Sequence, residues 1–302
     1  RSDTGPRLTL EHTQHRVPGI DWRAVTKLSV DRLLQSASVE LLSPPDASLW
    51  RWGLQAKAEH QQFSGYEVNS QRLRAGRNQL GENIDRSYYA QYDNAQTTGA
   101  LTDTRSAASA HYAWTWRRFD SLPFPSRGWG LGLELGGGMT LGEQHIPYLR
   151  GLAKTLWLLP IGDQGHRLSL RAEAGAVGTR NADNIPITQM FVAGGEHSVR
   201  GYAPGSIGIP GAGGIVTAGR YLLTGSAEWL MPIRQGQRRT DWDGVLFVDT
   251  GAVTNSPSHW TTATGVGVGA RWRSPVGPLQ MDLARALQTQ RWRLHISIGF
   301  RF

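Results

Sequence analysis

Apolar and polar residues alternate with a period of two along almost the whole chain. At its end, one face carries Trp292, Leu294, Ile296, Ile298, Phe300 and Phe302, and the other carries Arg293, His295, Ser297, Gly299 and Arg301. A strict period of two is typical of a β-strand with one apolar face and one polar or small face. The pattern therefore predicts a strand over Arg291–Phe302.

The same alternation recurs upstream, in segments separated by turn-forming runs such as VPG, SPPD and LPFPSRG. The other predicted strands lie near Pro6–Val17, Asp21–Gln35, Ser36–Leu42, Leu49–Phe63, Val68–Leu80, Arg86–Gln96, Ser106–Phe119, Gly128–Met139, His145–Leu159, His166–Val177, Arg220–Ile233, Trp242–Val253, Thr261–Ser274 and Gly277–Leu287. No stretch of about ten residues has the 3.6-residue period of a helix. The expected fold class is all-β.

Two features favour a transmembrane antiparallel β-barrel over a soluble β-sandwich, which would also alternate. The hairpins are too many for one sandwich core, and aromatic rings gather near segment ends, where they suit a membrane–water interface. These residues are Trp22, Trp50, Trp52, Tyr88, Trp114, Trp116, Trp129, Trp157, Trp229, Trp242, Trp272 and Trp292. Because the opposite face carries Arg, Glu, Ser and Gly, we expect a water-filled interior and one barrel domain over residues 1–302.

Composition excludes several other classes. No run of about 18 apolar residues exists, so no spanning helix is expected, whereas a barrel strand needs only alternate apolar positions. The chain has a net charge of +8, but its arginines are spread along the strands rather than gathered in a patch, which argues against nucleic-acid binding. The sequence has no Walker loop, His-Glu-x-x-His or Gly-x-Ser-x-Gly motif. We expect no enzyme activity, no metal and no cofactor.

One long segment, residues 180–219, interrupts the alternation. Apolar residues such as Met190, Phe191 and Ile207 indicate that it is packed rather than solvated, and in a barrel the available place is the lumen. The segment includes the stretch GGEHSVRGYAPG, in which glycines frame the single arginine Arg200. Glycines there would let the backbone fold back and approach the barrel wall closely.

The stretch GGEHSVRGY resembles the Val/Ile-Arg-Gly-Phe/Tyr loop signature of the outer-membrane assembly and translocation superfamily, which includes BamA, TamA and the two-partner secretion transporters. SDTGPRL resembles the first hairpin of TamA barrels, FVDTG the penultimate motif, and GVGVGARWRSPVGPLQMDLA the run into the last strands. The resemblance covers essentially the whole chain. It implies a 16-stranded barrel whose strand one is largely missing, with only Arg1–Thr4 remaining. It also implies a C-terminal fragment that lacks the preceding POTRA repeats.

The residues and the resemblance agree on a candidate lock for the loop. A guanidinium in a narrow lumen needs carboxylate partners, and the alternation places Glu228 and Asp249 inward on neighbouring strands. The resemblance implies that the loop arginine locks against these acidic residues. The expected lock consists of Val199, Arg200, Gly201, Tyr202, Glu228 and Asp249. The alternative is a solvated Arg200 with Asp249 capping a turn, and Asp282 is interpreted only as a lumen-lining carboxylate. For the strand glycines Gly267 and Gly269, one open alternative is that they leave room for the loop.

The resemblance also implies a function. The chain resembles the outer-membrane subunit of a translocation and assembly module, which inserts autotransporter-type barrel proteins through a lateral seam between its first and last strands. The seam and terminal-strand signal comprise Trp292, Leu294, Ile296, Ile298, Gly299, Phe300 and Phe302.

The expected setting is the Gram-negative outer membrane. The expected partners are outer-membrane lipid, nascent β-barrel clients and a TamB-like periplasmic protein anchored in the inner membrane. A two-partner secretion transporter, a BamA-type core assembly subunit and a passive porin remain alternatives.

Overall fold

A single antiparallel sheet of 15 strands dominates the computed structural model, which describes residues 8–63, 65–99 and 102–299. Its first ten strands are β1 (Leu8–Gln14), β2 (Arg23–Val30), β3 (Leu34–Leu42), β4 (Trp50–Gln62), β5 (Glu67–Leu80), β6 (Ile84–Thr98), β7 (Thr102–Phe119), β8 (Gly128–Leu141), β9 (Pro147–Ile161) and β10 (His166–Thr179). The last five are β13 (Tyr221–Gln235), β14 (Arg238–Thr254), β15 (Ala263–Ser274), β16 (Gly277–Ala286) and β17 (Trp292–Ile298). Over the same residues, no helix is long and apolar enough to cross a membrane.

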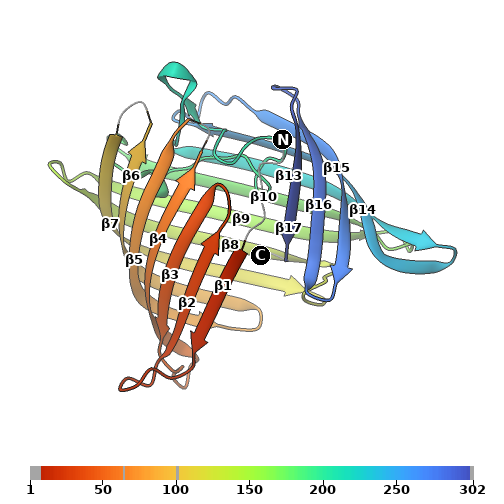
Figure 1. Ribbon diagram of the computed structural model, residues 1–302, viewed down its shortest axis with the longest axis horizontal. Coiled ribbons are helices and arrows are strands. Elements are labelled where there is room, and N and C mark those ends of the chain that lie inside the picture. The colour runs from red at the N-terminus through yellow and green to blue at the C-terminus, as the bar shows by residue number, and fades with distance from the viewer. Residues whose placement is uncertain (1–7, 64, 100–101, 300–302) are drawn as a thin grey trace.

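Each strand pairs with its neighbours in chain order, and β10 pairs with β13 across the long segment. The sheet curls so that its two edges, β1 in red and β17 in dark blue, lie on the same side of the barrel (Figure 1). In the described part of the chain, no ladder joins these edges. Because the number of strands is odd, β1 and β17 point the same way, so antiparallel closure takes one further strand. This arrangement fits the expected 16-stranded barrel, while Arg1–Thr4 lie outside the described residues.

The alternation of the terminal strand is confirmed. Leu294 and Ile296 are 40% and 46% exposed on the outer face, whereas His295 between them is 3% exposed on the inner face. Gly299, predicted inside this strand, instead follows it with a φ of +103°, because the ladder to β16 ends at Ile298. Phe300 and Phe302 lie outside the described residues.

Aromatic residues gather at one rim of the barrel. Trp129 of β8 stacks on its register partner Trp157 of β9, with ring centroids 6.2 Å apart, and Trp242 of β14 stacks on Trp272 of β15 at 5.6 Å. Strands β8 and β14 begin at this rim and β9 and β15 end there. Cross-strand aromatic pairs stabilise neighbouring strands, and rings at the rim suit the headgroup region of a bilayer.

Three predicted strand boundaries are wrong by four residues or more, and one of them is the start of β7, at Thr102 rather than Ser106. The chain turns after β2 rather than continuing to Gln35, because the Asp31 carboxylate accepts hydrogen bonds from the backbone N–H groups of Leu33 and Leu34, each at 2.7 Å. Strand β14 begins at Arg238 rather than Trp242, because Arg238 and Arg239 still pair with the end of β13. A local turn thus ends β2, whereas continued pairing with β13 lengthens β14.

The long segment between β10 and β13 is folded into the lumen, as expected, but it is not structureless. It contains the short 3-10 turns η1 (Ile187–Gln189) and η2 (Ala212–Gly214) and the two-residue strands β11 (Ile209–Pro210) and β12 (Val216–Thr217). We call residues 180–219 the lumen loop. Its apolar residues form a buried cluster with the wall. This cluster includes Ile185, Phe191, Ala193, Val199, Tyr202 and Ile207 of the loop and Val177, Leu222, Val253 and Ala286 of the strands.

Candidate functional site: the lock of the lumen loop

Arg200 is the centre of the site and is only 2% exposed. Its Nε and Nη2 donate to the two carboxylate oxygens of Asp249 at 2.7 and 2.8 Å, and its backbone N–H donates to the same Asp249 at 3.0 Å. Asp249 lies on β14 and is completely buried. A guanidinium with two parallel bonds to one carboxylate is strongly oriented as well as charge-paired. The arginine is therefore fixed in direction, not merely neutralised.

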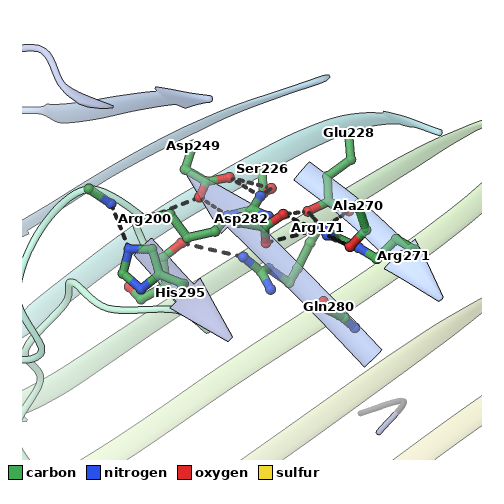
Figure 2. A network of polar contacts seen from close by, with 12 residues as sticks. Arg171, Arg200, Ser226, Glu228, Asp249, Ala270, Arg271, Gln280, Asp282 and His295 are labelled. Carbon is green, nitrogen blue, oxygen red and sulfur yellow. Dashed lines mark hydrogen bonds and ion pairs between the residues drawn. The ribbon is translucent and has the colours of Figure 1, made fainter. Parts of the chain in front are cut away.

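Two further carboxylates meet the same guanidinium (Figure 2). Arg200 Nη1 lies 2.6 Å from Glu228 on β13 and 2.8 Å from Asp282 on β16. Arg271 of β15 joins these two acids on their other side, at 3.3 Å from Glu228 and 2.5 Å from Asp282. The network thus links four consecutive strands through buried ion pairs.

Charge balance explains how three carboxylates can lie close together in the lumen. Glu228, Asp249 and Asp282 carry three negative charges, which Arg200, Arg271 and the nearby Arg171 match in number. Arginine stays protonated in proteins, so the pairing does not depend on a titrating cation. Phe247 lies under the guanidinium, 3.6 Å from Arg200 Cζ to the ring centroid, and shields one of its faces.

Backbone geometry requires glycine on both sides of this contact. Gly201 has a φ of +94°, and a Cβ there would lie 2.8 Å from the backbone nitrogen of Ala286. Gly265 on β15 faces the loop from the wall, and a Cβ there would lie 1.9 Å from the carbonyl oxygen of Arg200. The glycine that admits the loop is thus Gly265. The alternative that Gly267 and Gly269 leave room for the loop is wrong, because they make room for Phe247 and Asp282 instead.

The residues on either side of the arginine also hold the loop to the wall. Val199 is completely buried, and it packs so closely on β14 that a Cβ on Gly251 would meet it at 2.7 Å. The Tyr202 hydroxyl donates to the side-chain oxygen of Gln288 in the β16–β17 turn and lies 3.2 Å from the carbonyl oxygen of Thr264. The segment Val199–Tyr202 is therefore attached along the whole β13–β17 side of the barrel.

A second contact holds the loop to strands β6 and β9. The Gln189 side-chain amide donates to Asp93 of β6 at 2.7 Å, and the Gln189 carbonyl oxygen accepts from Arg150 of β9 at 3.1 Å. Asp93 is 1% exposed and also accepts from Arg72 at 3.0 Å. We call Gln189, Asp93 and Arg150 the Gln189 anchor, and Arg200 with Glu228, Asp249 and Asp282 the Arg200 anchor. The loop therefore spans the lumen between two walls.

The structure brings together every predicted lock residue, and it corrects one interpretation. Asp282 is not merely a lumen-lining carboxylate, because it binds both Arg200 and Arg271. Sequence reasoning also missed residues that complete the network. These are Arg271, Ser226, Phe247, His295, Gln189 and Asp93. Those that lie on strands occupy inward positions of the period-two pattern. That pattern predicts which face of the sheet a side chain is on, but not which residue it contacts.

A cavity of about 450 Å³, with several charged residues in its lining, lies beside the Arg200 anchor in the lumen. Its lining includes Lys154 and Glu173 of the wall and Glu196 and His197 of the loop. It also reaches Ser297 and Gly299 at the end of β17. Space therefore remains in the lumen on this side of the loop, next to the end of β17. Within the described residues, no group of three or more acidic or histidine side chains is arranged to hold a metal ion.

Comparison with known proteins places this architecture. Residues 34–302 match the model of the Omp85 superfamily domain, so the chain belongs to the Omp85 superfamily. It is 23% identical over 216 residues to the outer membrane protein assembly factor BamA of Neorickettsia risticii, which covers 68% of this chain and 28% of that relative. It is 32% identical over 124 residues to the chloroplastic outer envelope protein 80 of Arabidopsis thaliana, covering 37% of this chain and 15% of that relative. The chain spans less than a third of either relative.

Solved structures share the fold. A crystal structure of BamA from Haemophilus ducreyi lacking POTRA domains 1–3 superposes with a TM-score of 0.76 at 14% identity, covering 100% of this chain and 71% of that one. CdiB from Acinetobacter baumannii gives 0.62 at 13% identity, covering 97% and 56%. Both are similar in architecture. Membership in this superfamily of membrane proteins, rather than the lack of a motif, supports the expectation that the chain is not an enzyme.

Proposed function

We propose that this chain forms the barrel of an outer-membrane subunit that inserts β-barrel client proteins, and in particular the TamA-like subunit of a translocation and assembly module. Its clients would be nascent autotransporter-type barrels. Its setting would be the Gram-negative outer membrane, with a TamB-like periplasmic protein, anchored in the inner membrane, as a further partner. The SDTGPRL motif supports the TamA-like assignment over the other members of the superfamily, whereas Val-Arg-Gly-Tyr is shared by all of them.

One observation carries the proposal. The lumen loop is bound by buried ion pairs to the wall that ends in β17, while β17 itself has one paired neighbour in the described part of the chain. An open strand edge presents unpaired backbone N–H and C=O groups to which a client strand adds. The seven residues of β17 give a short ladder to β16, so this wall combines a rigid interior with a weakly paired edge.

A BamA-type core assembly subunit is the second candidate, because the barrel of Haemophilus ducreyi BamA superposes on the whole chain. The two candidates differ in their range of clients. A core subunit would assemble barrels of many kinds, whereas a translocation and assembly module would favour autotransporter-type clients.

Reconstitution separates the candidates. The complete protein is placed in lipid vesicles, and urea-dissolved clients are added: an autotransporter β-domain and a porin. Folding is followed by heat-modifiable mobility on gels and by protection from protease. We expect the autotransporter domain to fold faster in vesicles that contain the protein than in empty vesicles. The porin should fold at about the same rate in both.

Each other result changes the assignment. Equal acceleration of both clients means a BamA-type subunit. No acceleration of either client, together with export of one dedicated partner, means two-partner secretion. A large steady conductance with no acceleration means a porin, and it overturns the proposal altogether.

A further inference from the structure

The terminal strand β17 is joined to the lumen loop by one hydrogen bond, which is not an ion pair of the Arg200 anchor. His295 points inward from β17, and its Nε2 accepts a hydrogen bond from the backbone N–H of Gly201 at 3.1 Å (Figure 2). Gly201 directly follows Arg200. The bond therefore joins the open edge of the sheet to the centre of the lock.

The chemistry of this bond fixes the state of the imidazole. Nε2 accepts a hydrogen bond only when it carries no proton, so the ring is neutral with its proton on Nδ1. A neutral ring also suits its position, since it is 3% exposed and lies close to the positive charge of Arg200. The link between β17 and the loop is therefore a neutral hydrogen bond, unlike the ion pairs that hold the loop to β13, β14 and β16.

This difference divides the wall into two parts. The strands β13 to β16 are cross-linked by Arg200 and Arg271 through carboxylates, so separating them exposes buried charges, which is costly. Strand β17 contributes no residue to these ion pairs. Its ladder to β16 and the His295 bond are among the contacts that hold it, so it can separate while the ion pairs stay intact. The loop would then remain locked when the edge moves.

We propose that His295 is a positioning residue that couples the lumen loop to the seam strand: its bond from Gly201 sets how readily β17 leaves the sheet while the Arg200 anchor stays closed. The biological role of this link rests on the proposed function, because opening of the seam matters only if clients enter there. Its geometry and its test stand without that function.

The test is amide hydrogen exchange on the complete protein in lipid nanodiscs. Exchange of the β17 amides reports the opening equilibrium of that strand. His295→Leu keeps an apolar side chain but removes the acceptor and leaves the Gly201 N–H buried and unpaired. Losing one such bond shifts a local equilibrium by roughly tenfold, so we expect β17 amides to exchange about ten times faster. The strands β13 to β16 should keep their wild-type rates.

Two amides provide a chemical control. The side-chain oxygen of a glutamine sits about where Nε2 sits, whereas that of an asparagine ends near the position of Nδ1. We therefore expect His295→Gln to restore most of the β17 protection and His295→Asn to behave like the leucine variant. A merely structural role for a buried residue would not discriminate between two amides in this way.

Another buried histidine controls for general loosening of the barrel. His111 on β7 is 5% exposed and bonds Ser109 of its own strand at 2.9 Å. We expect His111→Leu to leave β17 exchange unchanged. The proposal is overturned if His295→Leu leaves β17 as in the wild type, if it loosens all strands equally, or if glutamine fails to restore protection. Failure of client assembly in the wild type would overturn the proposed function but leave this readout intact.

Discussion

The two anchors of the lumen loop use different chemistry for the same task. At the Arg200 anchor a buried cation meets three carboxylates on three strands, whereas at the Gln189 anchor a neutral amide meets Asp93, which Arg72 already pairs. Removing one partner of a buried ion pair costs about 3–5 kcal/mol, while a hydrogen bond to a charged group contributes about 1.5–3 kcal/mol. The loop is therefore held more firmly on the side next to the seam than on the side of β6 and β9.

The largest expected effect comes from removing the cation. Arg200→Ala leaves the buried Asp249 and Asp282 and the partly buried Glu228 with fewer positive partners, so the attachment of the loop should weaken by about 3–5 kcal/mol. We expect faster proteolysis within residues 180–219 and slower client assembly, with insertion of the barrel itself retained. Arg200→Lys is the control for charge, and it should recover only part of the loss because an ammonium cannot make the paired bonds to Asp249. Unchanged proteolysis and unchanged assembly would contradict the account.

A steric change tests the same anchor without altering charge. Gly265→Ala places a Cβ against the carbonyl oxygen of Arg200, which is backbone and cannot swing away. Overpacking of this kind costs about 1–3 kcal/mol, and we expect protease sensitivity of the loop to rise accordingly. The matched variant is Gly178→Ala, where nothing lies within 4 Å. If both variants behave like the wild type, the loop does not approach β15 as described.

The weaker anchor should respond locally. Gln189→Ala removes the amide bond to Asp93, so the loop should loosen near Gln189 by about 1.5–3 kcal/mol, while Val199–Tyr202 stays attached. Protease cleavage sites, mapped by mass spectrometry, should cluster between residues 180 and 192. Cleavage near Arg200 in this variant would mean that the two anchors act as one unit.

The smallest effect is expected far from both anchors, in the β7–β8 turn. Partial burial raises the pKa of Asp120, but hydrogen bonds from Ser126 and from the N–H groups of Arg127 and Ser121 outweigh it and hold that pKa at about 2. A carboxyl with a lowered pKa stabilises the fold above its ordinary value of 3.8, and this stabilisation is lost as the pH falls towards 2.

The measurement is the amide hydrogen exchange of this turn as the pH is lowered. Each value is compared with the stability of the same turn near neutral pH. We expect Asp120→Asn to loosen the turn at pH 6 and the wild type to loosen only below about pH 4. The exchange of the lumen loop should not change in either case. A wild-type turn that loosens at pH 6 to 5 would contradict the assignment.

The barrel and about half of the residues of the lock could be predicted from the sequence, and the limit has a physical reason. Alternation is local, so the inward direction of Glu228, Asp249 and His295 follows from their neighbours in the strand. Which inward residues meet depends on the stagger of strands and on the path of the loop. Gln189 and Asp93 are separated by 96 residues, and no short-range pattern connects them. Gly265 shows the same limit, since a glycine in a glycine-rich strand does not reveal which one faces the loop.

The central claim is that Arg200 attaches the loop to the wall next to the seam, and amide exchange across residues 180–219 tests it most directly. The comparison uses the wild type, Arg200→Ala and Gln189→Ala in lipid nanodiscs. We predict that Arg200→Ala exposes the Val199–Tyr202 amides and speeds exchange in β17 through the His295 bond, whereas Gln189→Ala speeds exchange only near Ile187–Gln189. Full protection of Val199–Tyr202 in Arg200→Ala would contradict the claim.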